Sequence, residues 1–180
     1  MVLIYTQKQG CYNKYMLKNY FRPNDKKELI SDISFDWLDD NHIDLIIIDV
    51  DNTIVVKGSN QVNPKTDEWI KECVKRCNNV IICSNNTSSV AYELSSRYSC
   101  FGFNLALKPF KIRLNRFIKQ NNIKYTNACI IGDQLFTDIW LGKRFKFKTI
   151  LVQLLNRQDY GLTKIFRFIE KILLEEKYGK

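Results

Sequence analysis

The sequence predicts an α/β fold, in which a doubly wound, mostly parallel sheet carries helices on both faces. Two observations predict this fold. Short β-branched apolar runs alternate with segments whose apolar residues recur at helical spacing, and polar residues follow each apolar run at once. Because uninterrupted apolar strands are buried on both faces, they are typical of parallel sheets.

Residues 1–44 precede the first clear strand and mix aromatic with basic side chains. We interpret them as an N-terminal arm with short helices, one at Lys26–Asp32 and one at Phe35–Leu38 that is capped by Ser34. The mixture is typical of a segment at an anionic membrane interface. It is equally compatible with an arm packed along the domain or stacked on nucleic acid. The main domain is expected over residues 45–180.

From Leu45 onward, strands and helices alternate. The expected strands are Leu45–Val50, Val80–Cys83, Phe103–Leu107, Ala128–Ile131 and Thr149–Leu155. The expected helices begin at Pro64, Ser88, Ile112, Phe136 and Leu162, and the last of them, which ends at Tyr178, is amphipathic. Ligands of doubly wound sheets bind outside the carboxyl ends of the strands, so the polar residues found there are the candidates for function.

The composition bounds the class of protein. With 180 residues, 45% of them hydrophobic and 26% charged, the chain is expected to form a soluble globular domain. It has neither a long apolar span nor a signal-peptide pattern, so we expect a cytoplasmic protein. The six cysteines lack partners for a zinc set and are expected to be reduced and mostly buried. The net charge of +9 suits nucleic acid, an anionic membrane or a phosphorylated substrate, but basic residues also simply solvate a surface.

The strand ends carry the candidate chemistry. Asp49 and Asp51 close the first strand, and two such carboxylates need a cation or a shared proton unless the strand runs out into a solvated turn. Right-handed crossovers bring the other strand ends to the same edge of the sheet. Those ends carry Ser84, Asn85, Lys108, Asp133 and Asp138. Oxygen-only donors favour Mg²⁺, whereas a lysine and a hydroxyl suit the oxygens of a phosphoryl group.

Four motifs in this order resemble those of the haloacid dehalogenase (HAD) superfamily of phosphatases. They are residues 49–54, Ser84, Lys108-Pro109 and residues 132–138. Residues 16–23, the Ser84-Asn85-Asn86 run and the fourth motif are similar to subclass IIIA, the branch that contains the phosphatidylglycerophosphate phosphatases. The resemblance covers roughly residues 15–175. Residues 101–107 depart from the pattern of the relatives, which leaves Lys108 as the best lysine and Lys111 as a fallback.

The resemblance implies a HAD-like Rossmannoid fold and a reaction through an aspartyl-phosphate. Asp49 would be the nucleophile, and Asp51 would act first as acid and then as base. Mg²⁺ would be held by Asp49, the main-chain carbonyl of Asp51, and Asp133. Asp138 would orient Lys108 or a metal-bound water. The phosphate would be bound by Ser84, by Lys108, which balances its charge, and by the main-chain amides near Asn52, Thr53 and Asn85; Ser84 and Lys108 also count as catalytic.

The spacing of the motifs bears on the substrate. The intervals from Thr53 to Val80 and from Ser84 to Lys108 are too short for a cap domain, so the site is expected to be open. An open site, the arm and the positive charge favour hydrolysis of phosphatidylglycerophosphate to phosphatidylglycerol, in phospholipid biosynthesis on the inner face of a membrane. A soluble HAD phosphatase of small or protein-borne phosphoesters is one alternative. A nonenzymatic nucleic-acid or ribosome-associated module is another.

Overall fold

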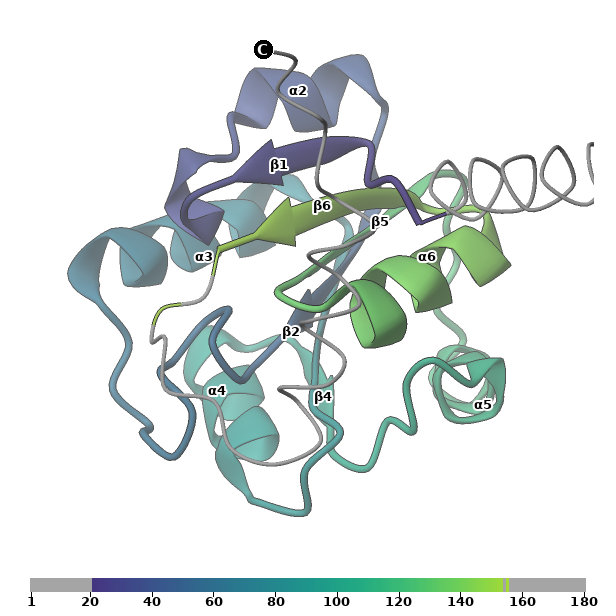
Figure 1. Ribbon diagram of the computed structural model, residues 1–180. Coiled ribbons are helices and arrows are strands. Elements are labelled where there is room, and N and C mark those ends of the chain that lie inside the picture. Colours follow the sequence, from purple (N-terminus) through teal and green to yellow (C-terminus); the bar gives the residue numbers. More distant parts are fainter. Residues whose placement is uncertain (1–20, 154, 156–180) are drawn as a thin grey trace, which may run out of the picture. The chain divides into compact units, whose positions relative to one another are not determined.

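A computed structural model describes residues 21–153 and 155 (Figure 1). The elements described below lie in the compact unit formed by residues 23–158. Its sheet has six parallel strands in the order β1-β6-β5-β2-β3-β4. The strands are β1 (Asp25–Lys27), β2 (Leu45–Asp49), β3 (Asn79–Cys83), β4 (Phe101–Phe103), β5 (Ala128–Gly132) and β6 (Lys148–Val152). The predicted parallel α/β fold is therefore confirmed.

The central strand β2 is flanked by β3 and β5 along its length. Asp49 pairs with Cys83, and Ile48 pairs with Ile131. All five residues of β2 are buried, as its uninterrupted apolar run predicts. This register brings the residues that end the three strands to one level at the carboxyl edge of the sheet.

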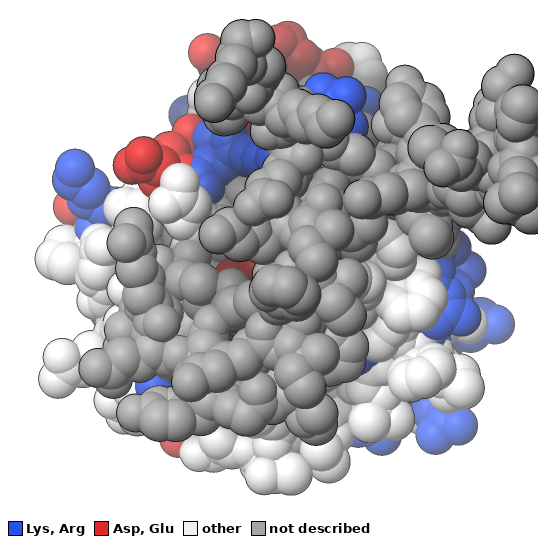
Figure 2. All heavy atoms as spheres, in the orientation of Figure 1, with Lys and Arg blue, Asp and Glu red and all other residues white. Residues whose placement is uncertain are grey.

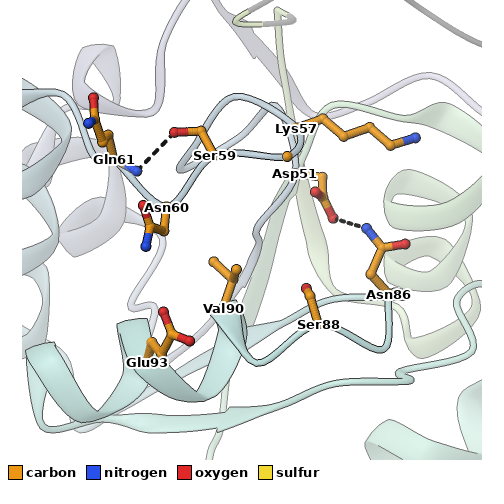
Figure 3. Close-up of a pocket in the computed structure, with 10 residues that line it drawn as sticks. Asp51, Lys57, Ser59, Asn60, Gln61, Asn86, Ser88, Val90 and Glu93 are labelled. Carbon is orange, nitrogen blue, oxygen red and sulfur yellow. Dashed lines mark hydrogen bonds between the residues drawn. The ribbon is translucent and has the colours of Figure 1, made fainter.

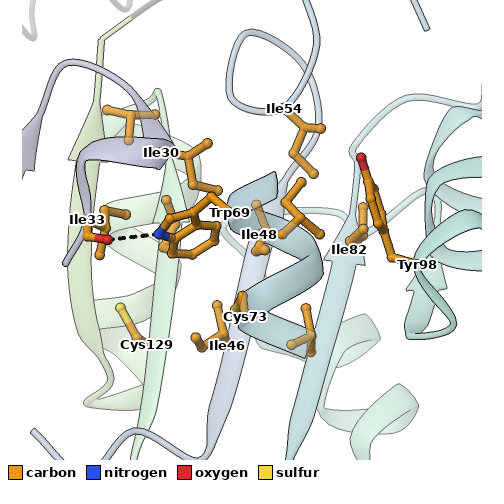
Figure 4. Packing of buried hydrophobic residues seen from close by; sticks show 14 of the residues in the cluster. Ile30, Ile33, Ile46, Ile48, Ile54, Trp69, Cys73, Ile82, Tyr98 and Cys129 are labelled. Carbon is orange, nitrogen blue, oxygen red and sulfur yellow. Dashed lines mark hydrogen bonds between the residues drawn. The ribbon is translucent and has the colours of Figure 1, made fainter. Parts of the chain in front are cut away.

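Two groups of helices cover the two faces of the sheet (Figure 1). Ile46 and Ile48 point to a core built with the short 3₁₀ helix η1 and with α2, α3 and α4, part of which Figure 4 shows. Leu45 and Ile47 point to a second core built with α5 and α6. These helices and helical turns are η1 (Ile30–Asp32), α2 (Phe35–Asp40), α3 (Pro64–Arg76), α4 (Val90–Tyr98), α5 (Lys111–Gln120), the π-helical turn η2 (Leu135–Ile139) and α6 (Trp140–Phe145).

Helix starts follow the local sequence signals. Ser34 caps α2 by accepting a hydrogen bond from the Trp37 amide at 3.2 Å, as predicted. Asn63 caps α3 in the same way, accepting from the amides of Lys65 and Thr66, and Pro64 occupies the first turn. Within the part of the chain that the structure describes, no helix is long and apolar enough to cross a bilayer.

The prediction of a helix at Lys26–Asp32 was wrong. Asp25–Lys27 is an edge strand that pairs with β6, with Lys26 opposite Leu151, and only Ile30–Asp32 forms a helical turn. The pairing with β6 satisfies backbone groups that a short isolated helix would leave to water. The domain boundary expected after residue 44 stays a prediction, although β1 belongs to the sheet.

The strand expected at Phe103–Leu107 lies two residues earlier, at Phe101–Phe103, and ends at Phe103. Beyond it the chain bends across the carboxyl edge of the sheet, where the Ala106 amide donates to the Ser84 carbonyl at 2.9 Å. Leu105 and Leu107 have left-handed backbones, with φ of 50° and 53°. Tertiary hydrogen bonds therefore override the strand propensity of this apolar run. The helix expected at 162–178 lies outside the described residues.

Candidate active site

Three buried carboxylates gather at the carboxyl edge of the sheet. Asp49 ends β2, Asp133 follows β5, and Asp138 lies in η2. Each offers an oxygen within 4.8 Å of the others, and all three side chains are buried. Parallel pairing of β2 with β5 explains why residues 84 positions apart in the chain come together here.

The ammonium of Lys108 lies among these carboxylates. Its Nζ contacts Asp49 Oδ1 and lies 2.8 Å from Asp138 Oδ1, and Lys108 is only 5% exposed. The other oxygen of Asp138 accepts hydrogen bonds from the Gln134 amide and the Thr137 hydroxyl, both at 3.2 Å. The fallback Lys111 instead lies over the ring of Phe145, 4.5 Å from its centroid.

Charge and burial oppose each other at this cluster. Burial raises the pKa of the Asp49 carboxyl well above its usual value, against the opposing effect of Lys108. Burial alone would lower the pKa of Lys108, but the charges of Asp138 and Asp49 outweigh it and raise that pKa well above its usual value. Lys108 is therefore held in its charged form. Lys108 can neutralise only one of the three carboxylates, so the ionised cluster would carry a net negative charge. A donor set made only of hard oxygen atoms fits Mg²⁺.

Asn85 fixes the position of Lys108. Its side-chain oxygen accepts from the Lys108 amide at 2.7 Å, and its side-chain nitrogen donates to the Lys108 carbonyl at 3.0 Å. The Lys108–Pro109 peptide bond is cis. The side-chain contacts of Asn85 are those of a residue that positions the lysine, and the binding of phosphate by main-chain amides near Asn85 stays a prediction.

Asp51 lies apart from the carboxylate cluster. Its Oδ2 accepts hydrogen bonds from Ser84 Oγ at 3.1 Å and from Asn86 Nδ2 at 2.7 Å. Ser84 Oγ also accepts from the Asn86 amide at 3.0 Å. Asp51 is half-buried whereas Asp49 is buried, so the two carboxylates of the first motif occupy different environments.

An open cleft of about 620 Å³ adjoins Asp51 (Figure 3). In Figure 3 Asp51 and Asn86 face each other, and the Lys57 side chain lies beside them. The cleft is lined by Asp51, Lys57, Gly58, Ser59, Asn60, Gln61, Asn86, Ser88, Val90 and Glu93. Its only covering segment from the 53–80 interval is the short loop at residues 57–61, in agreement with the predicted lack of a cap domain.

The turn after Asp51 is built from Asn52 and Thr53, which are 4% and 1% exposed. Asn52 has a φ of 60°, a left-handed conformation that Asn tolerates better than most residues. The amides of Asn52 and Thr53 donate to the carbonyls of Val55 and Val50, so they are engaged within the turn. Among the described residues the Thr53 hydroxyl has no hydrogen-bond partner, so it is available to donate a hydrogen bond to a ligand.

The structure thus brings Asp49, Lys108, Asp133 and Asp138 together and places Ser84 with Asp51 beside them. Asn86 and Lys57 were not predicted as site residues. Asn86 belongs to the Ser84-Asn85-Asn86 run, and its position just after the end of a strand was the one sequence signal that could have identified it as a site residue. Gly132 was also missed: a Cβ there would lie 2.3 Å from Asp138 Cγ, so only glycine leaves room for that carboxylate.

Two sequence comparisons show which known proteins this chain resembles. The model of a family described as mitochondrial PGP phosphatase matches residues 15–153. "Probable phosphatase YqeG" of Bacillus subtilis (strain 168) is 31% identical over 159 residues, which cover 88% of this chain and 92% of that protein.

Two solved structures are similar at a lower level. An uncharacterized protein from Listeria monocytogenes serotype 4b gives a TM-score of 0.49 at 16% identity, over 67% of this chain and 86% of that one. A 4-nitrophenylphosphatase from Thermotoga maritima gives 0.36 at 11% identity, over 71% and 91%. Both likenesses are too weak to support an argument about function. The sequence matches, by contrast, run through all four motifs, and the chain therefore belongs to the PGP phosphatase family of HAD-type phosphatases.

Proposed function

We propose that this phosphatase hydrolyses the phosphomonoester of phosphatidylglycerophosphate at a membrane surface, with Mg²⁺ as its cofactor. The observation that carries the proposal is the pairing of a buried nucleophile site, Asp49 with Lys108, and a separate half-buried carboxylate, Asp51, at an open cleft. The description of the matching family supplies the substrate.

In the proposed first step, an Asp49 carboxylate oxygen forms a bond to phosphorus while the bond from phosphorus to the alcohol oxygen breaks. Asp51 gives its proton to the departing alcohol oxygen. In the second step, Asp51 takes a proton from water as that water attacks phosphorus and frees the Asp49 carboxylate. Asn86 holds the Asp51 carboxylate by a hydrogen bond through both steps, whereas the Ser84 hydroxyl, which donates to Asp51 in the free protein, would turn to the phosphate when substrate binds.

The remaining residues hold charge and geometry. Lys108 is proposed to balance the charge that develops on the phosphoryl oxygens, since Asn85 and Asp138 hold it in place. Ser84 and the Thr53 hydroxyl are proposed as phosphate donors. Asp49 and Asp133 would hold Mg²⁺ with the main-chain carbonyl of Asp51, and Asp138 lies close enough to join them. The bound ion supplies positive charge that offsets repulsion between the Asp49 carboxylate and a phosphate dianion.

The form of the cleft supports a substrate that is part of a larger surface. Because the described residues leave the cleft open beside the short loop at residues 57–61, we expect the substrate itself to exclude water from the reacting atoms. Phosphatidylglycerophosphate carries a phosphodiester next to the phosphomonoester. Lys57 lines the cleft beside Asp51 and offers a cation for that second anion.

The test measures phosphate release from phosphatidylglycerophosphate in vesicles and from a panel of small phosphomonoesters, with Mg²⁺ and with EDTA. We expect the lipid to be preferred and EDTA to abolish turnover. Asp49→Asn should lower turnover to background, whereas the control Asp40→Asn, at an exposed position of α2, should leave it unchanged. Turnover of Asp49→Asn close to that of the wild type would refute the mechanism. Preference for a soluble phosphoester would refute the substrate.

A further inference from the structure

Four exposed apolar side chains cluster in the segment that delivers Lys108. Leu105, Leu107, Phe110 and Ile112 are 40%, 51%, 59% and 67% exposed. The described residues contain only two other large hydrophobic side chains with such exposure, Tyr92 and Tyr125. Single exposed apolar residues need no explanation, but four within eight positions mark a site of interaction.

The backbone holds these side chains outward. Ala106 and Lys108 are buried and alternate with the exposed Leu105 and Leu107. The amide of Leu105 donates to the Asn86 carbonyl at 3.1 Å, and that of Lys108 donates to the Asn85 side chain. Leu105 and Leu107 adopt left-handed backbones, which leucine disfavours. Their exposure is therefore part of a fixed local structure.

Cations lie around this apolar group and are anchored to the same segment. Arg113 Nε donates to the Leu105 carbonyl at 3.2 Å, and Arg144 Nη1 donates to the Pro109 carbonyl at 2.9 Å. The Arg144 guanidinium also lies 6.0 Å from the centroid of the Phe110 ring. Lys111 opens α5 between Phe110 and Ile112.

The charge around the segment is one-sided. Residues 99–153 contain ten lysines and arginines but only two acidic residues, Asp133 and Asp138, both of which are buried in the active site. Residues 21–98 contain nine basic and thirteen acidic residues. In Figure 2 the blue side chains at the lower right, over the region of α5 and α6, lie beside white ones, and the red ones in view lie elsewhere.

We propose that this surface docks the protein on an anionic phospholipid bilayer. The surface, here called the docking surface, consists of Leu105, Leu107, Phe110, Ile112, Lys111, Arg113 and Arg144. Its apolar side chains enter the boundary between headgroups and acyl chains, and its cations meet lipid phosphates. Leucine and isoleucine match hydrocarbon, whereas a surface for single-stranded nucleic acid would present aromatic rings for stacking. The proposal rests on the proposed function, for whose site it names the partner surface.

Docking here would set the active site against the headgroups. Lys108 lies between Leu107 of the docking surface and Pro109, and its ammonium contacts Asp49. The carbonyls of Ser84 and Asn86 receive the amides of Ala106 and Leu105, which ties the segment to Asp51 through its hydrogen-bond partners.

The test uses two substitutions that suit the local backbone. Leu107→Asn places at a left-handed position a residue that tolerates it. Phe110→Ser places a good capping residue at the N-cap of α5, where no side chain caps the helix now. Both remove apolar surface and are compatible with the local backbone conformation. In co-sedimentation with vesicles of phosphatidylglycerol and phosphatidylcholine, we expect the double variant to bind at least about tenfold more weakly than the full-length wild type.

The matched control is Tyr92→Ser, which removes an exposed ring from α4 on the other face of the sheet and should leave binding unchanged. A second pair of variants tests the charge. Lys111→Gln with Arg113→Gln, two cations of the docking surface at the start of α5, should weaken sedimentation severalfold. Lys65→Gln with Lys75→Gln on α3 removes the same charge from the opposite face and should not. If the first double variant does not fold, the comparison of these two charge pairs decides.

Turnover of p-nitrophenyl phosphate, a soluble substrate, should be the same in the docking variants and the wild type. Wild-type sedimentation with folded Leu107→Asn/Phe110→Ser would overturn the docking surface. Equal binding of the wild type to pure phosphatidylcholine vesicles, or binding of an RNA oligonucleotide in place of vesicles, would also overturn it. Vesicle binding that is lost in the variants, without any hydrolysis of phosphatidylglycerophosphate, would support the docking surface and refute the proposed function.

Discussion

Lys108 is the residue on which the candidate site depends most. It is buried between Asp49 and Asp138, and the Asn85 side chain makes hydrogen bonds with both its amide and its carbonyl. Burying a carboxylate without a partner costs several kcal/mol of folding free energy. By pairing with two of the carboxylates, Lys108 lowers this cost, and it also supplies the positive charge that the proposed reaction needs. The left-handed Asn52 and the close approach of Gly132 to Asp138 are further local conformations on which this arrangement depends.

Asp51→Asn should separate the two proposed steps. We expect turnover to fall about 100- to 10,000-fold, because proton transfer to the leaving group and from water is lost. With p-nitrophenyl phosphate the leaving group needs no proton, so the phosphorylated Asp49 should accumulate and be detected by intact-protein mass spectrometry.

Asn86→Ala is the control for that experiment. It removes a hydrogen bond to Asp51 and keeps the carboxylate, so a loss of about tenfold or less is expected. Full turnover of Asp51→Asn with a lipid substrate, where the leaving group is a poor one, would contradict the role given to Asp51.

At the residue scale the sequence predicted which side chains gather, but not how each is used. Asp49, Lys108, Asp133 and Asp138 were expected at strand ends, and parallel pairing suffices to bring them together. The use of Asn85 to hold the backbone of Lys108, and of Asn86 to hold Asp51, depends on loop conformations and rotamers. Spacing along the chain carries no information on those.

Among the elements, α3 and α4 are joined by one carboxylate. Asp67 of α3 accepts hydrogen bonds from Tyr98 Oη at 2.7 Å and from Arg97, both on α4, and pairs with Lys71 at 2.7 Å on its own helix. The hydrogen bond from Lys71, with that from Tyr98, lowers the pKa of Asp67 from its usual value.

Asp67→Asn should lower the free energy of unfolding by about 1–2 kcal/mol at pH 7. The lowered folded-state pKa means that the ionised form stabilises the fold above the usual aspartate pKa of about 3.9, and that this contribution is lost as the pH falls through the lower folded value. The deficit of the variant should therefore shrink in acid. Urea unfolding at pH 7 and below pH 4 measures both.

The control for the Asp67 variant is Glu68→Gln, at an exposed position one residue further along α3. It should change the free energy of unfolding by less than about 0.5 kcal/mol. A deficit for Asp67→Asn that stayed constant between pH 7 and pH 3 would mean that the charge of Asp67 contributes nothing to the contact between α3 and α4.

The elements that sequence reasoning placed wrongly are both at the margins of the sheet. The edge strand β1 is three residues long, too short for a periodic signal, and its pairing with β6 involves residues about 125 positions away. The apolar run that begins at Phe101 has the composition of a strand. Only its first three residues form one, and the residues after Phe103 bend across the carboxyl edge of the sheet. Long-range partners decided both cases, and these are invisible to local patterns.

For the compact unit as a whole, strand and helix alternation predicted the parallel sheet, and the lengths of the intervals predicted the open cleft. The net charge of +9 was known from composition, but its distribution depends on which helices share a face. Helices α2 to α4 come from residues 21–98 and cover one face, whereas α5 and α6 come from residues 99–153 and cover the other.

Vesicle binding by the wild type should have a component that depends on salt and one that does not. Raising NaCl from 0.05 M to 0.5 M shortens the Debye length from about 14 Å to about 4 Å, and should weaken sedimentation with phosphatidylglycerol vesicles. The apolar contribution should persist at high salt in the wild type and be missing from Leu107→Asn/Phe110→Ser. Salt-independent sedimentation of the wild type would contradict a role for the basic face.

The division of charge between the two faces of the sheet also has a consequence before any contact is made. A body with an excess of acid on one side and of base on the other has an electric dipole across it, and the field near an anionic bilayer exerts a torque on that dipole. For the described residues, this torque would turn α5 and α6 toward the bilayer to which we propose the protein docks. A larger fraction of its collisions with the bilayer would then occur in the orientation that allows docking, which would raise the association rate.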